Sequence, residues 1–288
     1  MTMTGTVPAS RKQSLDGCRM TWARTVAIEA GGILREMQAH RLGLKTVSKG
    51  GTDFATEADT KAEASIIELI KREFPGDDIL AEESAPATYE EYASKENLWV
   101  IDPLDGTTNF SLGEENYAVS IGFVRRGIPL FGMINQPARG LIAYGGQGGM
   151  QAKARIERST DGGPVERPLQ ASPETDPKKC TIGHNWYYTI EGKQRMCEQL
   201  ARIIPGNFRA FVARSCAVGD LLAVADGRMH GYVQENLKPW DVAAAGLLVQ
   251  LAGGTVTGID GTPWHPFRHD ILASNGHQHE LLLKLLTP

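Results

Sequence analysis

The sequence lacks the features that mark several other classes of protein. Its 288 residues hold no apolar run long enough to cross a membrane, and the N-terminus has no apolar segment of the kind a signal peptide needs. Its four cysteines are scattered and have no CxxC spacing, which favours reduced thiols over a disulfide framework. A formal net charge of −4 gives no electrostatic reason to expect nucleic acid as a partner. We therefore expect a cytoplasmic protein that binds neither membrane nor nucleic acid.

Two kinds of catalytic site also lack support. No G-x-S-x-G motif is present, so a serine nucleophile of the hydrolase type is not indicated. Histidines gather near the C-terminus, and they could suggest a transition-metal site. They lie in a Pro-rich and then polar segment without cysteine, so loop histidines are the better interpretation. These residues are His265, His269, His277 and His279.

The sequence does contain alternating helical and strand-like segments, which favour an α/β layer in the second half. Apolar periodicity predicts helices at 18–38, between Asp59 and Pro75, at 220–225 and at 242–251. Short apolar runs predict strands at 79–81, 98–101, 117–124, 129–134 and 255–257. A polar stretch at 145–179 marks a subdomain boundary. We expect a polar tail at 1–15, an α+β subdomain at 16–165 and an α/β subdomain at 166–288.

Acidic residues stand directly after three of the apolar runs. Glu82 and Glu83 follow Ile79-Leu-Ala, Asp102 and Asp105 follow Trp99-Val-Ile, and Asp241 follows Trp240. Acidic surface turns are common, so Glu82-Glu83 alone would carry no argument. The residues after Asp105 make the difference, because Gly106, Thr107 and Thr108 read as a helix entry whose free N–H groups can hold phosphate oxygens. Carboxylates beside a phosphate cradle need cations between them, and carboxylate oxygens are ligands that Mg²⁺ prefers.

Four segments resemble the pattern of the inositol monophosphatase family of metal-dependent phosphatases, in the family's order. The segment Trp99-Val-Ile-Asp-Pro-Leu-Asp-Gly-Thr-Thr-Asn-Phe110 is similar to its first signature, and Trp240-Asp-Val-Ala-Ala-Ala-Gly246 to its second. Asp53-x-x-Thr56-x-x-Asp59 and Ala81-Glu-Glu-Ser84 also fit. The resemblance extends from about residue 20 to 275. A single short motif would be weak evidence, but four in order are specific.

The resemblance implies a fold, an activity and roles for individual residues. The fold would be a layered αβαβα sandwich of two subdomains, and family members are commonly homodimers. The activity would be Mg²⁺-dependent hydrolysis of a small phosphorylated metabolite, with lithium inhibition as a further family trait. Glu82, Asp102 and the Leu104 carbonyl would hold one Mg²⁺, and Asp102, Asp105 and Asp241 a second, with a third, weaker ion near Glu82. Thr107, oriented by Asp59, would position the attacking water.

The expected substrate side departs from the family pattern. The positions that usually read Gly-Ser/Thr-Ala-Ala are here Ser215, Cys216, Ala217 and Val218. The Glu that inositol-specific members carry seven residues before the last metal Asp is here Gln234, with Glu235 one step later. A neutral amide cannot supply the same charge-assisted contact to a hydroxyl. Either residue could take that role, so specificity for myo-inositol is open.

Several alternatives therefore remain. Relatives with the same metal-binding core hydrolyse histidinol phosphate, nucleotide 3′-phosphates or fructose 1,6-bisphosphate, and no residue singles out one of these. Arg209 and Arg214 could contact a second anionic group, and Lys49 could contact phosphate or stay a solvated surface lysine. Cys216 as a nucleophile is disfavoured because the phosphate cradle lies elsewhere. A binding or regulatory protein that retains the fold, as some bacterial relatives do with the transcription machinery, is the alternative of another class.

Overall fold

The structure is a computed structural model that describes residues 9–50, 52–148 and 154–286. Seven α-helices lie in these residues: α1 (Ala9–Ala39), α2 (Glu57–Glu73), α3 (Thr107–Leu112), α4 (Ile190–Ile203), α5 (Ala217–Ala225), α6 (Pro239–Leu251) and α7 (His279–Leu286). None of the described helices is both long and apolar enough to span a membrane.

Two larger sheets and one hairpin organise the chain. The hairpin pairs β1 (Thr46–Gly50) with β2 (Asp53–Thr56). The seven-stranded sheet runs in the sequence order of its strands: β3 (Asp78–Ala81), β4 (Leu98–Asp105), β5 (Ala118–Arg125), β6 (Ile128–Gln136), β7 (Leu141–Gly146), β8 (Arg155–Thr160) and β9 (Gly163–Pro168). The five-stranded sheet has the order β11 (Ala210–Val212), β10 (Thr181–Gly183), β12 (Gly231–Glu235), β14 (Asp270–Ser274) and β13 (Thr255–Thr257).

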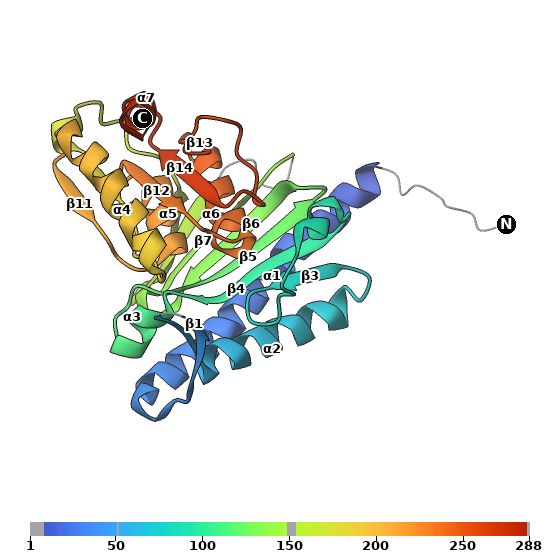
Figure 1. Cartoon of the computed structure of the whole chain (residues 1–288). Helices are drawn as coiled ribbons and strands as arrows, with labels where there is room; N and C mark the ends of the chain where they lie inside the picture. The colour runs from blue at the N-terminus through green and yellow to red at the C-terminus, as the bar shows by residue number, and fades with distance from the viewer. Residues whose placement is uncertain (1–8, 51, 149–153, 287–288) are drawn as a thin grey trace.

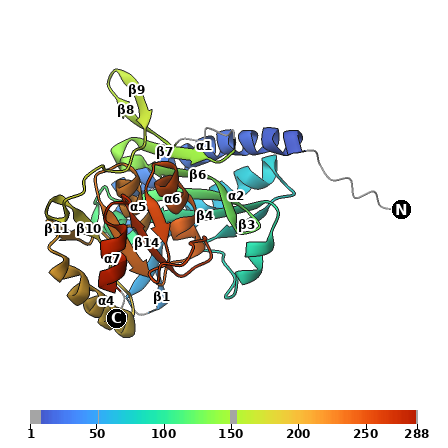
Figure 2. The ribbon, with the colours of Figure 1, turned by 90° about the horizontal axis from the view of Figure 1, so that it is seen from above.

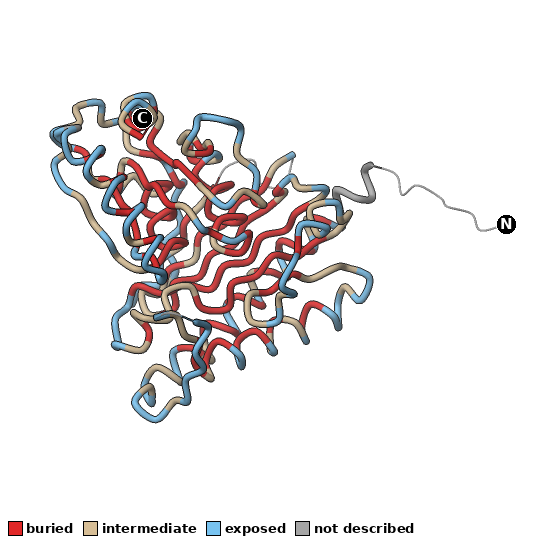
Figure 3. Tube along the Cα trace, viewed as in Figure 1, coloured by how far each residue is buried: buried red, intermediate tan, exposed pale blue. Residues whose placement is uncertain are grey.

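These elements form five layers, as Figures 1 and 2 show. Helices α1 and α2 cover one face of the seven-stranded sheet, and α5 and α6 cover its other face. The five-stranded sheet packs on the far side of α5 and α6, and α4 and α7 form the last layer. The fold is therefore the αβαβα sandwich that the family resemblance implied. Figure 3 shows that the buried residues follow the central strands and the helices between the sheets.

Close backbone packing joins the layers. Glycines in β5 and β6 face α6, and a Cβ at Gly132 would lie 2.7 Å from the Ala244 carbonyl oxygen. On the opposite face, Asn135 at the end of β6 donates from Nδ2 to the Ala27 carbonyl oxygen of α1 at 2.7 Å. Gly31 lies directly against this asparagine, so α1 approaches the sheet at a point without a side chain. Small residues thus allow α6 on one face and α1 on the other to approach the seven-stranded sheet closely.

The predicted elements are present with shifted ends. The strands expected at 117–124 and 129–134 are β5 and β6, and the helix expected before Pro75 is α2. The first helix begins at Ala9, not near residue 18, so the tail expected over 1–15 was wrong for 9–15; residues 1–8 lie outside the described part. We also missed the β8–β9 hairpin, because the polar stretch 145–179 reads as a linker in the sequence. Figure 2 shows this hairpin extending from the seven-stranded sheet. The chain leaves this sheet at Pro168, and the division into two subdomains stays a prediction.

Candidate active site

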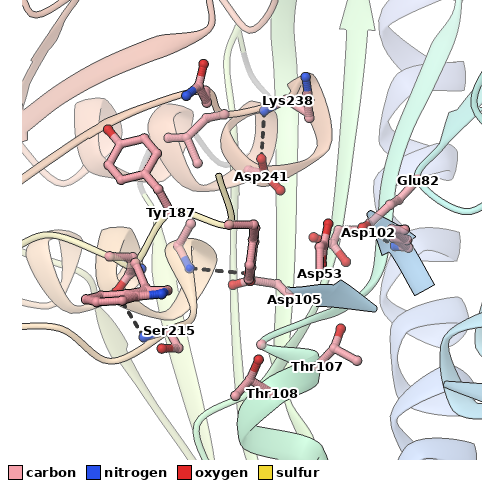
Figure 4. A pocket seen from close by; sticks show the side chains of 18 of the residues that line it. Asp53, Glu82, Asp102, Asp105, Thr107, Thr108, Tyr187, Ser215, Lys238 and Asp241 are labelled. Carbon is pink, nitrogen blue, oxygen red and sulfur yellow. Dashed lines mark hydrogen bonds and ion pairs between the residues drawn. The ribbon is translucent and has the colours of Figure 1, made fainter. Parts of the chain in front are cut away.

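A large cavity lies between the seven-stranded sheet and the segments that lead into α4, α5 and α6. Its volume is about 1290 Å³. It is lined by most of the residues that we expected at the site, but not by Asp59 or Val218: Glu82, Asp102, Leu104, Asp105, Gly106, Thr107, Thr108, Ser215, Cys216, Ala217, Gln234, Glu235 and Asp241. Figure 4 shows the carboxyl groups of Asp102, Asp105 and Asp241 facing one common space. Segments more than a hundred residues apart in the sequence therefore meet here.

An irregularity at the end of β4 places two aspartates on the cavity. The register of β4 against β5 shifts between Asp102 and Asp105, so the strand departs from regular alternation at this point. Such bulges re-aim side chains. The Asp102 carboxylate is fixed by the Leu104 N–H, which donates to Oδ1 at 3.0 Å. Pro103 and Leu104 lie between the two aspartates in this irregular part of β4.

The N-terminus of α5 holds the Asp105 carboxylate. The Val218 N–H donates to Oδ2 at 2.7 Å, and the Ala217 N–H donates to Oδ1 at 3.3 Å. The buried Cys216 thiol donates to Oδ2 at 2.8 Å. A carboxylate at a helix N-terminus is stabilised by the helix dipole and by free N–H groups. Cys216 and Ala217, which we expected on the substrate side, thus contact an expected metal ligand.

Asp241 reaches the same space from the second half of the chain. It occupies the first turn of α6 and accepts a hydrogen bond from the Lys238 N–H at Oδ2, 2.6 Å away, as Figure 4 shows. The other oxygen is free to face the cavity. Pro239 at the helix start has no N–H to satisfy and fixes the chain entry into α6. The position of Asp241 is therefore set by the local geometry of a helix N-terminus.

Glu82 and Glu83 follow β3 and share one cation. Lys49, from the β1–β2 hairpin, places Nζ 2.6 Å from an oxygen of each glutamate. Burial lowers the pKa of this lysine, but the two glutamates outweigh burial and raise it above its usual value. Glu83 is also anchored through its N–H, which donates to Glu63 at 2.7 Å. Lys49 is therefore paired and not a solvated surface lysine, and its contact with phosphate stays a prediction.

Asp59 and Thr107 form a hydrogen-bonded pair beside the carboxylates. Thr107 Oγ1 donates to Asp59 Oδ1 at 3.0 Å and lies 3.2 Å from the Leu104 carbonyl oxygen. Asp59 Oδ2 accepts from the N–H and the hydroxyl of Thr56 in the capping box that begins α2. Burial raises the pKa of Asp59 although these hydrogen bonds lower it. The pair thus has a fixed orientation and a carboxylate that accepts a proton more readily than an exposed one.

The start of α3 offers N–H groups to the cavity. Gly106 caps this helix with a φ of 89°, a conformation that favours glycine. A Cβ at Gly106 would also lie 2.8 Å from the Asn116 carbonyl oxygen. The N–H groups of the first helical turn have no acceptor within the helix. Figure 4 shows Thr107 and Thr108 below Asp105.

The charges of the buried carboxylates demand a counter-cation. Burial, together with the neighbouring acids, raises the pKa of Glu82 to about 8 and that of Asp241 to about 7. Burial, reinforced by Glu82 and Asp220, raises the pKa of Asp105 to about 6 although hydrogen bonds lower it. The pKa of Asp102 is raised well above its usual value by burial and by Glu82. Carboxylates that repel one another ionise together only when a cation lies between them.

The set of oxygen donors therefore fits hard divalent cations such as Mg²⁺. Within residues 9–50, 52–148 and 154–286, no three His, Cys, Asp or Glu side chains are already arranged closely enough to hold an ion. This also applies to the four C-terminal histidines, of which His279 is buried and bonded to Thr257 and Ser274. Among the carboxylates, the Lys49 ammonium already occupies a cation position between Glu82 and Glu83.

The expected substrate residues are largely engaged within the protein. Gln234 Oε1 accepts from the Asn185 N–H at 2.8 Å, and Glu235 Oε2 lies 3.5 Å from Arg195 Nε. The Ser215 N–H donates to Asn185 Oδ1 at 2.9 Å, and Ser215 has a φ of 51°, which is uncommon for a residue with a side chain. Arg214 pairs with the buried Asp220 at 2.6 Å. A second anion would thus have to compete with Asp220 for Arg214.

Sequence reasoning missed a further wall of the cavity. Trp186, Tyr187 and Tyr188 follow β10 and line the cavity opposite the β4 aspartates, together with Arg195. The available signal was a Trp-Tyr-Tyr run directly after a strand, in a stretch for which we made no prediction.

The comparisons with known proteins agree with this geometry. A sequence profile of the inositol monophosphatase family matches residues 18–287. The chain belongs to the inositol monophosphatase family. It is 35% identical over 240 residues to the inositol-1-monophosphatase of Synechocystis sp., covering 81% of this chain and 77% of that one. It is 32% identical over 267 residues to the putative Nus factor SuhB of Neisseria meningitidis, covering 91% and 95%. Among solved structures, the SuhB protein of Bartonella henselae superposes with a TM-score of 0.81 at 28% identity, covering 94% of this chain and 98% of that one.

The family assignment supports phosphatase activity. Its fold relatives also confirm the five-layered sandwich. The roles of the individual site residues remain expectations that the geometry makes testable.

Proposed function

We propose that this chain is a Mg²⁺-dependent phosphatase that hydrolyses a small phosphate monoester. The observation that carries the proposal is the meeting of Glu82, Asp102 and Asp105 with Asp241 on one cavity, beside the Asp59–Thr107 pair. Residues that are distant in sequence converge on a buried acidic site, which is costly unless the site has a function. The inositol-1-monophosphatase name of the Synechocystis relative supports the same reaction class.

The roles of the side chains follow from their contacts. Bound Mg²⁺ ions would supply charge neutralisation for the phosphate and acidify an attacking water. Glu82, Asp102, Asp105, Asp241 and the Leu104 carbonyl would hold two ions, with a third, weaker ion near Glu82. The first-turn N–H groups of α3 would bind phosphate oxygens. Thr107 Oγ1 would accept a hydrogen bond from the attacking water while it donates to Asp59 Oδ1, so Asp59 orients the hydroxyl and can take up the proton.

The first test is phosphate release in the presence and absence of Mg²⁺. A panel of inositol 1-phosphate, glycerol 2-phosphate, histidinol phosphate, fructose 1,6-bisphosphate and 3′-phosphoadenosine 5′-phosphate covers the substrate alternatives. We expect release that requires Mg²⁺ and falls by at least about a thousandfold in Asp102→Asn. Asp78→Asn is the matched control, because Asp78 begins β3 and pairs only with exposed Lys95. Equal release from the two variants would contradict the proposal.

A second role, binding to another macromolecule, is favoured by one finding. Two relatives, each 32% identical to this chain, are named putative Nus factor SuhB, in Neisseria meningitidis, and Nus factor SuhB, in Escherichia coli. A cell that lacks this protein and is complemented with Asp102→Asn separates the roles. Full complementation by the inactive variant would assign the cellular function to binding. A homodimer stays a prediction of the family resemblance, to be checked by the mass in solution.

A further inference from the structure

Two aromatic side chains are exposed on the cavity wall opposite the phosphate cradle. Trp186 is 50% exposed and Tyr188 is 44% exposed, and both line the cavity. Large aromatic side chains that stay exposed in a concave site usually contact a ligand, because exposing them to water is unfavourable. Their exposure here therefore calls for an explanation by function.

The segment that carries them is rigidly held. Asn185 before Trp186 is buried and accepts the N–H groups of Arg214 and Ser215 at Oδ1, at 3.0 and 2.9 Å. Tyr187, between the two aromatics, is only 4% exposed, and its hydroxyl accepts the Glu235 N–H at 2.8 Å. Anchoring Asn185 and Tyr187 thus presents Trp186 and Tyr188 as fixed surfaces, with little ordering needed when a ligand binds.

Tyr188 lies close to the reacting end of the cavity. It lines the same cavity as Asp105, Thr107 and Asp241. Trp186 is held from one side by Lys193, whose Nζ lies 5.3 Å from the ring centroid. The two rings therefore border the region that the alcohol part of a phosphate monoester would occupy when its phosphate group sits at the start of α3.

Three polar side chains beside the two rings already form contacts within the protein. Asn185 Nδ2 donates to the Tyr232 hydroxyl at 3.1 Å, and its Oδ1 is already occupied by two N–H groups. The Gln234 carbonyl is used by the Asn185 N–H, and Glu235 faces Arg195. A polyhydroxylated ring needs several such partners, and buried hydroxyls without them are costly. The two exposed rings of the wall suit an apolar, planar group.

We propose that the alcohol part of the substrate carries a planar aromatic ring, which packs against Trp186 and Tyr188 while its phosphate group is hydrolysed at the carboxylates. The inference rests on the proposed phosphatase function and names the substrate class of that site. Aromatic stacking is tolerant of the ring's identity, so the class includes phenyl, imidazolyl and purine alcohol phosphates.

A matched pair of substrates tests the ring directly. The probes are 2-phenylethyl phosphate and 2-cyclohexylethyl phosphate, which share chain length and ring size and differ in planarity and aromaticity. Simple burial of apolar surface would favour the saturated ring, whereas stacking favours the aromatic one. We expect the ratio of kcat/KM to favour the phenyl compound by about five- to a hundredfold. The kcat/KM for 2-phenylethyl phosphate should also exceed the kcat/KM for inositol 1-phosphate.

Two variants assign the preference to the proposed residues. Trp186→Leu and Tyr188→Leu keep apolar side chains and remove the rings, so each should raise KM for the phenyl compound with little change in kcat. The double variant should bring the phenyl-to-cyclohexyl ratio close to one. Ile190→Leu is the control, because Ile190 is exposed just beyond Tyr188 and does not line the cavity. The turnover of glycerol 2-phosphate and of the phenyl compound should both stay unchanged in Ile190→Leu.

Binding measurements separate this inference from the proposed function. Titrations with the non-hydrolysable 2-phenylethyl and 2-cyclohexylethyl phosphonates, in the presence of Mg²⁺, report recognition without turnover. Tighter binding of the phenyl phosphonate that is lost in the double variant supports the inference even if no phosphate is released. Release of phosphate from glycerol 2-phosphate with equal binding of the two phosphonates would overturn the inference and leave the phosphatase function standing. A dimer that dissociates in the double variant, with unchanged phosphonate binding, would assign the rings to an interface and would also overturn it.

Discussion

Lys49 Nζ lies 2.6 Å from Glu82 Oε1 and so occupies a cation position at an expected metal ligand. Both side chains are about one quarter exposed, which strengthens the pair relative to a fully solvated one. Lys49 also bonds Glu83 at the same distance, so it bridges the two acids that follow β3. A divalent cation at Glu82 must displace this ammonium group or share the carboxylate with it.

We expect Lys49→Met to bind Mg²⁺ more tightly. Removing the competing charge should lower the dissociation constant by roughly tenfold, about the effect of one hydrogen bond to a charged group. Calorimetric titration with Mg²⁺ in the absence of substrate measures this directly. Lys95→Met removes an exposed pair with Asp78 and should leave the constant unchanged. Weaker binding in Lys49→Met would show that the lysine supports the metal site.

The Cys216 thiol should act through Asp105. It donates to Asp105 Oδ2 at 2.8 Å, and such contacts orient metal ligands. We expect Cys216→Ala to weaken Mg²⁺ binding and lower kcat by about tenfold, because supporting contacts are typically worth ten- to a hundredfold. Cys216→Ser keeps a donor and should restore most of both, and exposed Cys197→Ala should be neutral. Inactivation of the serine variant as well would revive the nucleophile reading of Cys216.

Stability without metal should fall as the pH rises. The folded pKa values of about 6 for Asp105, about 7 for Asp241 and about 8 for Glu82 lie above the usual values of 3.8, 3.8 and 4.5. A raised folded pKa stabilises the fold at low pH, and this contribution is lost as the pH rises through the folded pKa. Protons also compete with Mg²⁺ for the same oxygens, so Mg²⁺ should bind more tightly over the same window. Thermal unfolding at about pH 5.5 and about pH 8.5, with and without Mg²⁺, measures both effects.

The gain from Mg²⁺ in that experiment should therefore be larger at the higher pH. Asp241→Asn removes one of the titrating groups and should reduce the difference between the two pH values. An equal gain at both values would show that the carboxylates are already ionised in the metal-free protein.

Two adjacent glycines of α1 should respond oppositely to alanine. A Cβ at Gly31 would collide with Asn135 and lie 3.0 Å from Pro137 Cβ, whereas a Cβ at Gly32 meets nothing within 4 Å. We expect Gly31→Ala to lower the free energy of unfolding by about 1–3 kcal/mol, the usual cost of overpacking. Gly32→Ala should raise it by about 0.5–1 kcal/mol, because glycine is unfavourable within a helix. Denaturant unfolding of the pair measures both, and equal effects would mean that α1 does not pack on β6 as described.

The sequence allowed the carboxylates to be found because they belong to local patterns. Asp102, Asp105 and Thr107 lie within a few residues of one another, and their meaning depends on the turn and helix that follow. The αβαβα layering came from the resemblance, since apolar periodicity yields elements but not their order in space. The β8–β9 hairpin was missed because its strands are mostly exposed, so its polar residues show no apolar pattern.

The contacts between distant segments were beyond local reasoning. Nothing near Lys49 in the sequence indicates that its ammonium group meets Glu82 and Glu83, which lie more than thirty residues away. The same holds for Cys216, whose thiol reaches an aspartate 111 residues earlier in the chain. The Trp186–Tyr188 segment has no resemblance to a motif, and its meaning emerges only once the cavity is known. Side-chain partners of this kind are set by tertiary packing.

The cavity is built from two sources that can change independently. The acids that would perform the chemistry lie just after β3, at the end of β4 and at the start of α6, whereas the aromatic wall lies on a single connection between β10 and α4. Replacing residues in that connection would change which substrates enter the cavity without changing the reaction that they undergo. An arrangement of this kind allows the substrate specificity of an enzyme to change through a few positions while its reaction stays the same. A change of substrate would then begin with substitutions at residues 186–188 and would leave the carboxylates unchanged.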